Sequence, residues 1–443
     1  MKSLEKPPIM ANLLELVSRL DEQGRSIFYK IDDSQIVAHI NEEYLYWDKA
    51  KYKVPDTLKG LLSAEELWQL VKRQRRSGQK IITFAHERFF FTTTDNLFRQ
   101  LHEFDLHLGG SLGGREIIGD TDKHKYLIGS IMEESIASSQ IEGAVTSRVV
   151  AKDMLRKNRP PRNVSEQMIV NNYLTIRWIL EIKDQPLTEE ALLNLHRLMT
   201  ANTMDKREEA GQLRQHDDIH VVDAIDGDII HTPPTYTLMP DFVTDLCRFF
   251  NDETPTFFLH PVVKASIVHF LIGYFHPFTD GNGRTARALF YWYLLRKGYW
   301  LTEYLSISRV IMQSQTQYYR AFQYTESDDN DLTYFVLYQV KALRKAYDEL
   351  KKYIERKVDE KRQVINWQQL DGLSPRQAEI LTWLQRQPDA TLSVKEVETK
   401  LGISNQTART DLLDLVRKGY LAELSINRKE RQFIRGPGFG NLP

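Results

Sequence analysis

The spacing of apolar residues divides the chain into stretches of different character. Residues 1–110 mix two patterns: the aromatic and β-branched run IITFAHERFFFTTT favours strand structure, and SAEELWQLVKRQRR favours a helix capped by Ser63 and Glu66. From 120 to 345 the apolar positions recur mostly at helical spacing. The exception, at about 219–236, has β-branched runs on both sides of DAIDGD and predicts a β-hairpin. The pattern therefore predicts a mainly α protein, with a mixed α/β N-terminal domain and a hairpin inserted in a helical domain.

The C-terminal part begins with a charged stretch and continues as a small patterned domain. Residues 346–372 are rich in charge and predict a solvated helical connector. Residues 373–437 predict three helices followed by a two-stranded ribbon. Nine apolar positions are expected to form the core of these helices: Ile380, Leu381, Leu384, Val394, Val397, Leu401, Leu412, Leu415 and Val416.

Composition narrows the class of protein. A chain of 443 residues has room for roughly two to four domains. Its net charge of −1 argues against a protein that coats nucleic acid by bulk charge. The single cysteine, Cys247, excludes an internal disulfide and suggests a reducing compartment. The segment MKSLEKPPIMANLLEL lacks the apolar core of a secretory signal, and the longest apolar run, ASIVHFLIGYF, is about half of the ~20 residues that span a bilayer. We therefore expect a cytoplasmic protein without membrane contact.

One short stretch, HPFTDGNGRTAR, concentrates polar chemistry behind an apolar helix. Gly281 and Gly283 allow the backbone to turn with its N–H groups directed into one concavity, at a helix start where anions bind. Arg284 and Arg287 share a face of that helix's first turn. Two guanidinium groups beside such a nest suit a polyphosphate.

Two further side chains of this stretch supply reactive groups. Asp280 is the only carboxylate of the loop, and Mg²⁺ takes one or two protein carboxylates beside phosphate oxygens. His276 is a candidate general base, because a neutral imidazole near pH 7 can take a proton from a hydroxyl. The structural alternative is a glycine turn that caps a helix, with a buried histidine and surface arginines. The combination favours activation of a nucleophile beside a phosphorus centre.

At every position this stretch resembles the signature of the Fic family, H-x-F-x-(D/E)-G-N-G-R-x-x-R. The resemblance covers about 120–345 and implies a helical domain that transfers AMP from ATP to a Ser, Thr or Tyr hydroxyl of a target protein, releasing pyrophosphate. By position it implies a general base at His276, a buried anchor at Phe278, an Mg²⁺ ligand at Asp280, a phosphate-contacting nest at Gly281, Asn282 and Gly283, a phosphate contact at Arg284 and a γ-phosphate contact at Arg287.

Two elements outside the signature extend the resemblance. The hairpin at about 219–236 resembles the family's flap, which aligns a segment of the target protein by strand pairing. Tyr318 and Tyr319 in QYYRAF are similar to the tyrosines that close the adenine pocket, with aromatic core packing as the alternative. Some relatives carry an asparagine where this chain has Glu326, so that contact is not implied here.

A helix at about 123–143 resembles the family's inhibitory helix, whose motif is (S/T)-x-x-x-E-(G/N). The segment SSQIEG supplies this motif with Ser138, Glu142 and Gly143. A carboxylate delivered to Arg287 would pair with the guanidinium and put negative charge where the γ-phosphate must lie. The sequence therefore predicts a self-inhibited adenylyltransferase that Glu142→Gly activates. Because the glutamate of some relatives also positions a water that removes AMP, AMP removal stays an alternative.

The C-terminal domain, 373–437, resembles the winged helix-turn-helix family. Four residues lie early on its third helix, where base edges would be read: Asn405, Gln406, Thr407 and Arg409. Basic residues of the ribbon suited to phosphate contacts are Arg428, Lys429, Arg431 and Arg435. Asp411 and Asp414 add opposing charge to the same helix, and winged helices also dock proteins or dimerise, so a homodimer is an alternative to DNA as the partner.

Three functions therefore compete at the level of sequence. The first is the self-inhibited AMP transferase, with ATP and Mg²⁺ as its cofactors. The second is a DNA-binding regulator whose helical core only senses nucleotide. The third is another phosphorus transfer, such as phosphorylation, on the same scaffold.

Overall fold

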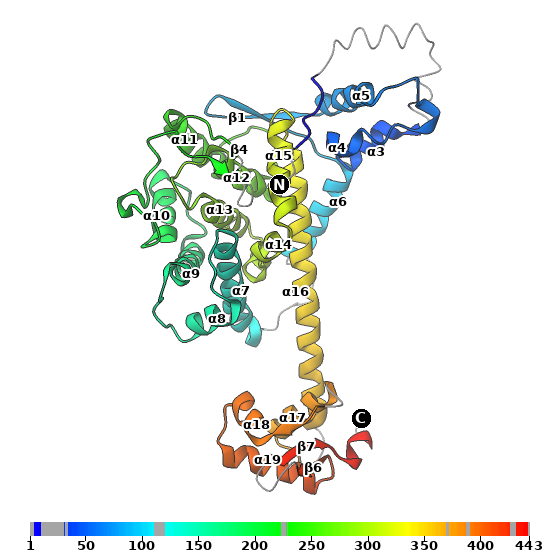
Figure 1. Ribbon diagram of the computed structural model, residues 1–443, viewed down its shortest axis with the longest axis vertical. Coiled ribbons are helices and arrows are strands. Elements are labelled where there is room, and N and C mark those ends of the chain that lie inside the picture. The colour runs from blue at the N-terminus through cyan, green and yellow to red at the C-terminus, as the bar shows by residue number, and fades with distance from the viewer. Residues whose placement is uncertain are drawn as a thin grey trace. The chain divides into compact units, whose positions relative to one another are not determined.

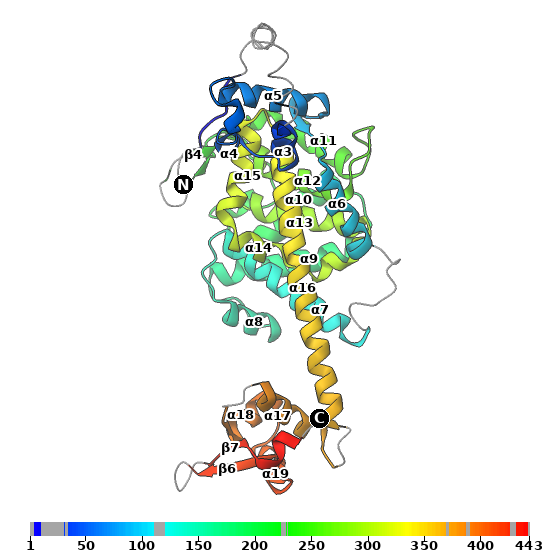
Figure 2. The same cartoon turned by 90° about the vertical axis from the view of Figure 1, so that its right-hand side faces the viewer.

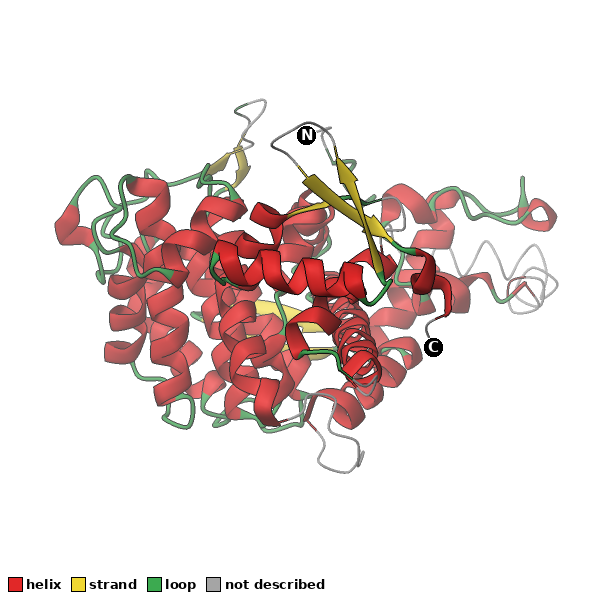
Figure 3. Ribbon diagram, turned by 90° about the horizontal axis from the view of Figure 1, so that it is seen from below, coloured by secondary structure: helices red, strands yellow, loops and turns green. Residues whose placement is uncertain are grey.

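Helices make up most of the protein, and its strands form a few small sheets (Figure 3). The computed structural model describes residues 4–9, 31, 34–109, 120–222, 227, 229–368, 372–386, 390–425 and 431–441. Two compact units divide the chain, Met1–Asp348 and Glu349–Pro443, and Figure 1 labels the elements of each. No helix in the described parts is long and apolar enough to cross a membrane.

The first unit begins with a mixed α/β region. Its main elements are α3 (Ile36–Glu42), α4 (Trp47–Ala50), α5 (Ala64–Ser77), β1 (Lys80–Phe84), β2 (Glu87–Phe91) and α6 (Asp95–Phe104). The expected cap of α5 is present, because Ser63 accepts a hydrogen bond from the Glu66 N–H while the Glu66 carboxylate accepts one from the Ser63 N–H. The run expected as strand is an antiparallel hairpin, which turns at Ala85 and His86 with φ angles of 44° and 71°. Such a turn usually contains Asn-Gly, and this one lacks that signal.

This region is tied to the loop that follows α15 in the same unit. Phe90 of β2 receives a backbone hydrogen bond from Leu332 and donates one to Asn330, with N···O distances of 2.8 and 3.0 Å. Lys72 of α5 forms a buried ion pair with Asp328, at 2.8 Å. The expected boundaries at residues 110, 345 and 372 stay predictions, but the N-terminal region and the helical region share one compact unit.

The rest of the first unit is a helical domain. Its helices are α7 (Asp120–Ile141), α8 (Arg148–Arg156), α9 (Val164–Ile182), α10 (Glu189–Thr200), α11 (Met239–Phe250), α12 (Pro261–Phe275), α13 (Asn282–Arg296), α14 (Ile307–Gln313), α15 (Gln315–Ser327) and α16 (Thr333–Gln368). Helices α12 and α13 contact each other along their length and lie inside the domain (Figure 2). Both are buried on nearly every residue, including the polar Asn282, Arg284 and Arg287 in the first turns of α13.

Two features of this domain bear on the predicted boundaries. The expected hairpin exists as two short antiparallel strands, β3 (Val221–Val222) and β4 (Ile229–His231), in which Val221 pairs with His231. Most of the predicted turn, residues 223–226 and 228, lies outside the described residues. The predicted connector is the second half of α16, which is continuous from Thr333 and has buried residues as far as Ile354.

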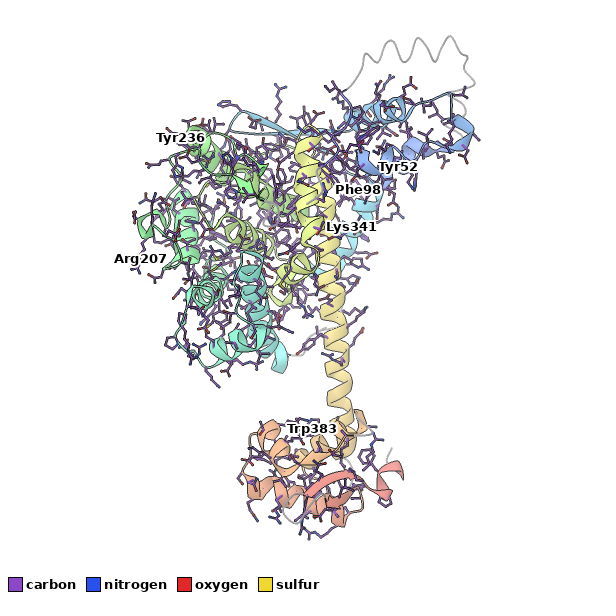
Figure 4. All side chains as sticks on the ribbon, viewed as in Figure 1. Tyr52, Phe98, Arg207, Tyr236, Lys341 and Trp383 are labelled. Atoms are coloured by element: carbon purple, nitrogen blue, oxygen red, sulfur yellow. The ribbon has the colours of Figure 1, made fainter. Side chains whose placement is uncertain are left out.

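The second unit contains the predicted three helices and ribbon. Its elements after α16 are α17 (Pro375–Arg386), β5 (Leu392–Ser393), α18 (Val394–Leu401), α19 (Asn405–Arg417), β6 (Leu421–Ser425) and β7 (Arg431–Arg435). The short strand β5 was not expected; it joins the ribbon in the order β5-β7-β6. Six of the nine predicted core residues are buried: Ile380, Leu381, Leu384, Val397, Leu412 and Leu415. Val394, Leu401 and Val416 pack on that core from its partly buried edge, as does Trp383, which Figure 4 labels.

Candidate active site

His276 lies where α12 ends and the loop to α13 begins. Its N–H makes the last helical hydrogen bond of α12, to Ile272, and its backbone turns into the left-handed region with φ 48° and ψ 60°. The helix ends here because Pro277 has no N–H and disfavours helical geometry in the residue before it. The turn leaves the imidazole of His276 partly exposed.

The hydrogen bonding of His276 suits a general base. Nδ1 lies 3.2 Å from the Gly273 carbonyl oxygen, which can only accept, so Nδ1 carries the hydrogen and Nε2 keeps its lone pair. Burial lowers the pKa of His276 to about 4, and the nearby charges of His231 and Arg214 act in the same direction. The ring is therefore neutral near pH 7 and can accept a proton from a hydroxyl.

Ring stacking and side-chain hydrogen bonds hold the backbone of the loop after His276 in place. Phe278 is buried, as expected, and stacks on His196 with the ring centroids 3.8 Å apart. His196 Nε2 donates to the Asp280 carbonyl at 2.8 Å, while its Nδ1 accepts from the Gly211 N–H at 2.9 Å. Asn282 Oδ1 accepts from the Phe278 N–H at 3.0 Å, and its Nδ2 donates to the Phe278 carbonyl at 2.8 Å.

This bracing changes the expected role of Asn282. The sequence placed it in a phosphate-contacting nest, but both polar groups of its side chain are occupied by the loop backbone. The Asn282 N–H, in the first turn of α13, is the group still suited to an anion. His196 was not predicted as a site residue, because a single histidine in an amphipathic helix gives no signal of what it packs on.

The start of α13 forms an anion-binding geometry. Gly281 precedes it with φ 78°, and a side chain at this position would press on Thr200. The Gly281 N–H donates to the Asp280 carboxylate at 2.6 Å. The N–H groups of the first helical turn have no partners within the helix and form its positive end. Asp280, Gly281 and the start of α13 therefore lie together as the sequence predicted.

The two signature arginines are buried beside this helix start. Arg284 donates to the Met199 carbonyl and to Asp280, at 3.3 Å each. Arg284 Nε and Arg287 Nη1 are buried and have no hydrogen-bond partner. Buried cationic donors without acceptors cost free energy, so the arrangement is typical of a place where an anion binds.

The last turn of α7 and the residue that follows it supply three acceptor atoms to Arg287. Arg287 Nε donates to Ser138 Oγ at 2.9 Å, and Nη2 donates to the Ser138 carbonyl at 3.0 Å and to Glu142 Oε1 at 2.9 Å. Gly283 makes room for this carboxylate, because a Cβ at that position would fall on Glu142 Oε1. Gly143 has φ +92° just after the helix ends. The geometric part of the predicted motif is therefore present.

A second contact that the sequence did not predict holds the same face of α7. Glu134 accepts hydrogen bonds from Tyr291 Oη at 2.8 Å and from the Ser308 N–H at 3.0 Å, and also from the Ser308 hydroxyl. Glu134, Ser138 and Glu142 are four residues apart and face α13 in a row. The sequence gives no signal for this contact, because Ser308 is 174 positions away from Glu134.

The two tyrosines of α15 have different environments. Tyr318 is buried in an aromatic cluster, and its hydroxyl lies 2.8 Å from His269 Nε2. Tyr319 is partly exposed, with its ring 5.3 Å from that of Tyr318. The geometry of Tyr318 agrees with the core-packing alternative, while an adenine contact by either tyrosine stays a prediction.

The third helix of the second unit presents polar side chains to solvent. Asn405, Gln406 and Arg409 are exposed on the first turns of α19, and Thr407 is partly buried. Asn405 donates to Glu398 at 2.8 Å. These positions agree with the predicted reading surface.

The two acidic residues that argue against DNA binding, Asp411 and Asp414, are paired with basic residues of the same unit. Asp411 is buried and accepts from Arg376 of α17 at 2.8 Å, and Asp414 pairs with Lys418 at 2.7 Å. In the ribbon, Arg431 is exposed and pairs with Glu423 at 2.8 Å. Arg435, also a predicted phosphate contact, donates to the carbonyls of Leu384 and Gln385 at 2.6 and 2.9 Å, and the remaining two, Arg428 and Lys429, lie outside the described residues.

Comparison with known families identifies both parts of this chain. Residues 186–294 match the Fic/DOC family, and residues 371–429 match the MarR family. The protein therefore contains a Fic domain, with the site around His276, and a MarR-type winged-helix domain.

Individual relatives match over the Fic region. The chain is 31% identical over 121 residues to protein adenylyltransferase fic-1 of Caenorhabditis briggsae, covering 27% of this chain and 22% of that protein. It is 33% identical over 121 residues to protein adenylyltransferase Fic of Nematostella vectensis, covering 26% of this chain and 25% of the other. The match thus spans about a quarter of these relatives or less. A crystal structure of a Fic family protein from Desulfovibrio desulfuricans is similar with a TM-score of 0.49 and 21% identity, over 78% of this chain and 97% of that one.

Proposed function

We propose that this protein is a self-inhibited adenylyltransferase, which transfers AMP from ATP to a Ser, Thr or Tyr hydroxyl of a target protein or of itself. The observation that carries the proposal is that a neutral His276 and two buried arginines lie at the two ends of one loop, the arginines at the start of α13. A base and an anion site lie at opposite ends of one loop, with Phe278 buried between them. The relatives named protein adenylyltransferase support the same reaction.

Each of these residues has a separate role in the proposed reaction. His276 Nε2 takes the proton from the target hydroxyl, whose oxygen forms a bond to the α-phosphorus of ATP. The bond from that phosphorus to the bridging oxygen of the β-phosphate breaks, and pyrophosphate leaves with the bonding electrons. Arg284 and Arg287 bind phosphate oxygens through the donors that lack partners in the protein. The loop braces hold the base and the phosphate site at a fixed separation.

A divalent cation fits this site only together with a ligand. Asp280 has a carboxylate that is 57% exposed, and the described residues contain no group of three metal-ligating side chains. One carboxylate is what Mg²⁺ uses when phosphate oxygens and water complete its shell. Asp280 would hold the ion, and the bound Mg²⁺ would supply neutralisation of phosphate charge.

Self-inhibition follows from what Arg287 already binds. The Glu142 carboxylate occupies one donor of Arg287 and adds a negative charge beside Gly283. A γ-phosphate that binds the unpartnered Nη1 of the same guanidinium would lie beside this charge and is repelled by it. ATP then binds with its α-phosphorus displaced from the attacking hydroxyl, and a small displacement costs about a hundredfold in rate.

The flap is the proposed place for the target segment. Exposed apolar side chains on and next to its strands are Val222, Ile229 and Tyr236, the last of which Figure 4 labels. A segment that pairs with the free edge of such a hairpin gains backbone hydrogen bonds whatever its sequence, so strand addition can align a hydroxyl with His276.

The test is transfer of label from ATP that is labelled on the α-phosphate. With Mg²⁺, Glu142→Gly should label itself or lysate proteins, wild type should label them weakly, and Glu142→Gly with His276→Ala should not. A mass increase matching AMP identifies the reaction, whereas a phosphate-sized increase would replace the proposal by phosphorylation. Loss of AMP from labelled protein on adding wild type would show removal as a second activity.

A second function is supported by the winged helix. The carboxylates of α19 turn to Arg376 and Lys418, which leaves Asn405, Gln406 and Arg409 as the exposed groups of its first turns. We propose that this surface binds DNA. Affinity for duplex DNA should fall with rising salt, and Arg409→Ala should weaken it. Salt-independent association of the chain with itself would instead favour the dimer.

A further inference from the structure

The carbonyl end of α12, next to His276, is covered by two basic side chains that flank the flap. The first is Arg214, which is almost fully buried. Its Nε donates to the His276 carbonyl at 2.9 Å, and its Nη2 lies 3.4 Å from the Phe275 carbonyl and also donates to the Pro234 carbonyl. The Arg214 N–H donates to Pro277 at 2.9 Å. One guanidinium therefore joins both the last turn of α12 and the exit of the flap.

The second is His231, the last residue of β4. Its Nε2 lies 2.7 Å from the Tyr274 carbonyl oxygen, and its Nδ1 lies 2.8 Å from Glu326 Oε2 on α15. A carbonyl and an ionised carboxylate can only accept hydrogen bonds, so both ring nitrogens carry hydrogen. The geometry thus describes an imidazolium, held at the end of a helix where positive charge is favourable.

The two side chains respond differently to pH. The guanidinium of Arg214 stays charged throughout. Burial of His231 acts against its charged form, but the hydrogen bond and attraction from Glu326 outweigh it and raise the pKa of His231 above its ordinary value. The contacts of His231 are therefore favoured below this raised pKa and are lost as pH rises through it, because a neutral ring cannot donate from both nitrogens.

We infer that His231 is a positioning residue which, in its doubly protonated form, fixes strand β4 of the flap to the last turn of the helix that carries His276. This role depends on the proposed function in one respect only, namely that the flap is the element that aligns the target segment. The contact itself sets where β4 lies relative to the base. When the ring loses a proton, either the Glu326 or the Tyr274 bond must break, and the flap loses its defined position.

Three other titratable side chains, Tyr274, His276 and His220, lie near His231 and its strand. The Tyr274 ring lies 5.2 Å from the His231 ring, and burial raises the pKa of its phenol. His276 stays neutral because burial lowers its pKa to about 4. His220, on the chain entering β3, lies 3.4 Å from Thr232 Oγ1. Glu326 is the one carboxylate recorded in contact with the ring among the described residues.

Hydrogen–deuterium exchange of the wild-type chain tests the inference without requiring transfer activity. Protection factors of peptides covering 229–236, corrected for intrinsic exchange, should fall by at least about tenfold between pH 6.5 and 9.5. Glu326→Gln should abolish this loss, because its amide can donate to Nδ1 of a neutral ring while Nε2 still donates to Tyr274. His231→Gln should show low protection at every pH. Asp105→Asn is the matched control, because Asp105 pairs with His260 outside the flap at 3.0 Å and its loss should leave the flap profile unchanged.

Autolabelling links this contact to the reaction. In the Glu142→Gly background, the alkaline fall in labelling should follow the exchange transition and be absent in Glu326→Gln. Flap protection that is independent of pH in wild type, or that has the same pH profile in wild type and Glu326→Gln, overturns the inference. A transition in exchange without any label on protein supports the role of His231 and refutes the transferase instead. Labelling that keeps its alkaline fall in Glu326→Gln, although the exchange transition is gone, also overturns the role of His231 as a positioning residue.

Discussion

Replacing Glu142 by glutamine separates the charge of the proposed brake from its shape. The amide has nearly the same size as the carboxylate, so it fits the space that Gly283 leaves open, and its oxygen can still accept from Arg287. Only the negative charge is lost. If the charge holds ATP in an unproductive position, Glu142→Gln should raise the rate of labelling above wild type and remain below Glu142→Gly.

The size of the effect follows from the contact. Glu142 Oε1 lies 2.9 Å from Nη2 of Arg287, whose side chain is 3% exposed while that of Glu142 is 27% exposed. A hydrogen bond to a charged group contributes about 1.5–3 kcal/mol and a bond between neutral groups about 0.5–1.5 kcal/mol. Because Arg287 keeps its charge, removing the charge of Glu142 should weaken the closed form by at most about 1–1.5 kcal/mol, a rate increase of up to roughly 5- to 12-fold. Removing the side chain should give roughly 10- to 150-fold.

The assay is the initial rate of label incorporation from ATP labelled on the α-phosphate, measured for full-length variants. Glu133→Gln is the matched control on the same helix, because Glu133 pairs with Arg148 and Lys152 and not with Arg287. Its rate should equal that of wild type. If Glu142→Gln labels at the wild-type rate while Glu142→Gly is active, the side chain blocks by shape, and the reasoning from charge is refuted.

Two further predictions address the base and the N-terminal region. Burial lowers the pKa of His276 to about 4. On the acid side, labelling by Glu142→Gly should therefore be lost only as pH falls through about 4, and an acid-side fall near pH 6.5 in the pH–rate profile would contradict the assignment. Asp328→Asn leaves Lys72 buried without its ionic partner and should lower the free energy of urea unfolding by about 3–5 kcal/mol. Asp329→Asn, at an exposed pair, should cost under about 1 kcal/mol, and equal losses from both variants would show that burial does not set the cost.

The parts of the site that sequence predicts well are contiguous or follow from local chemistry. His276, Asp280 and the two arginines lie within one turn and one helix start, so their gathering needs only a proline to end α12 and a glycine to begin α13. Helix starts with capping residues are equally local, as at Ser63. In each case the partners are a few residues apart, and backbone geometry alone brings them together.

The parts that sequence could not predict depend on partners far along the chain. Arg214 contacts His276 across 62 positions, and His231 contacts Glu326 across 95. Each is a lone polar residue in a loop or short strand, where an exposed side chain is the ordinary expectation. Asn282 shows a different limit: the motif does not reveal that its side chain braces the loop, while a phosphate contact through its N–H stays a prediction.

The two ends of the loop explain why these distant residues matter. Helix α12 ends at His276 with free carbonyls, and α13 begins after Gly281 with free N–H groups, so a negative and a positive helix end lie a few residues apart. Arg214 and His231 place positive charge at the carbonyl end of α12, and Glu142 places negative charge beside the N–H end of α13. In the proposed reaction, the carboxylate of Glu142 therefore stands beside the place where the phosphates of ATP would bind, and it satisfies part of that anion site. A signal that relieves the proposed inhibition must then displace Glu142 from Arg287, since the base, the loop and the helix ends are already in place.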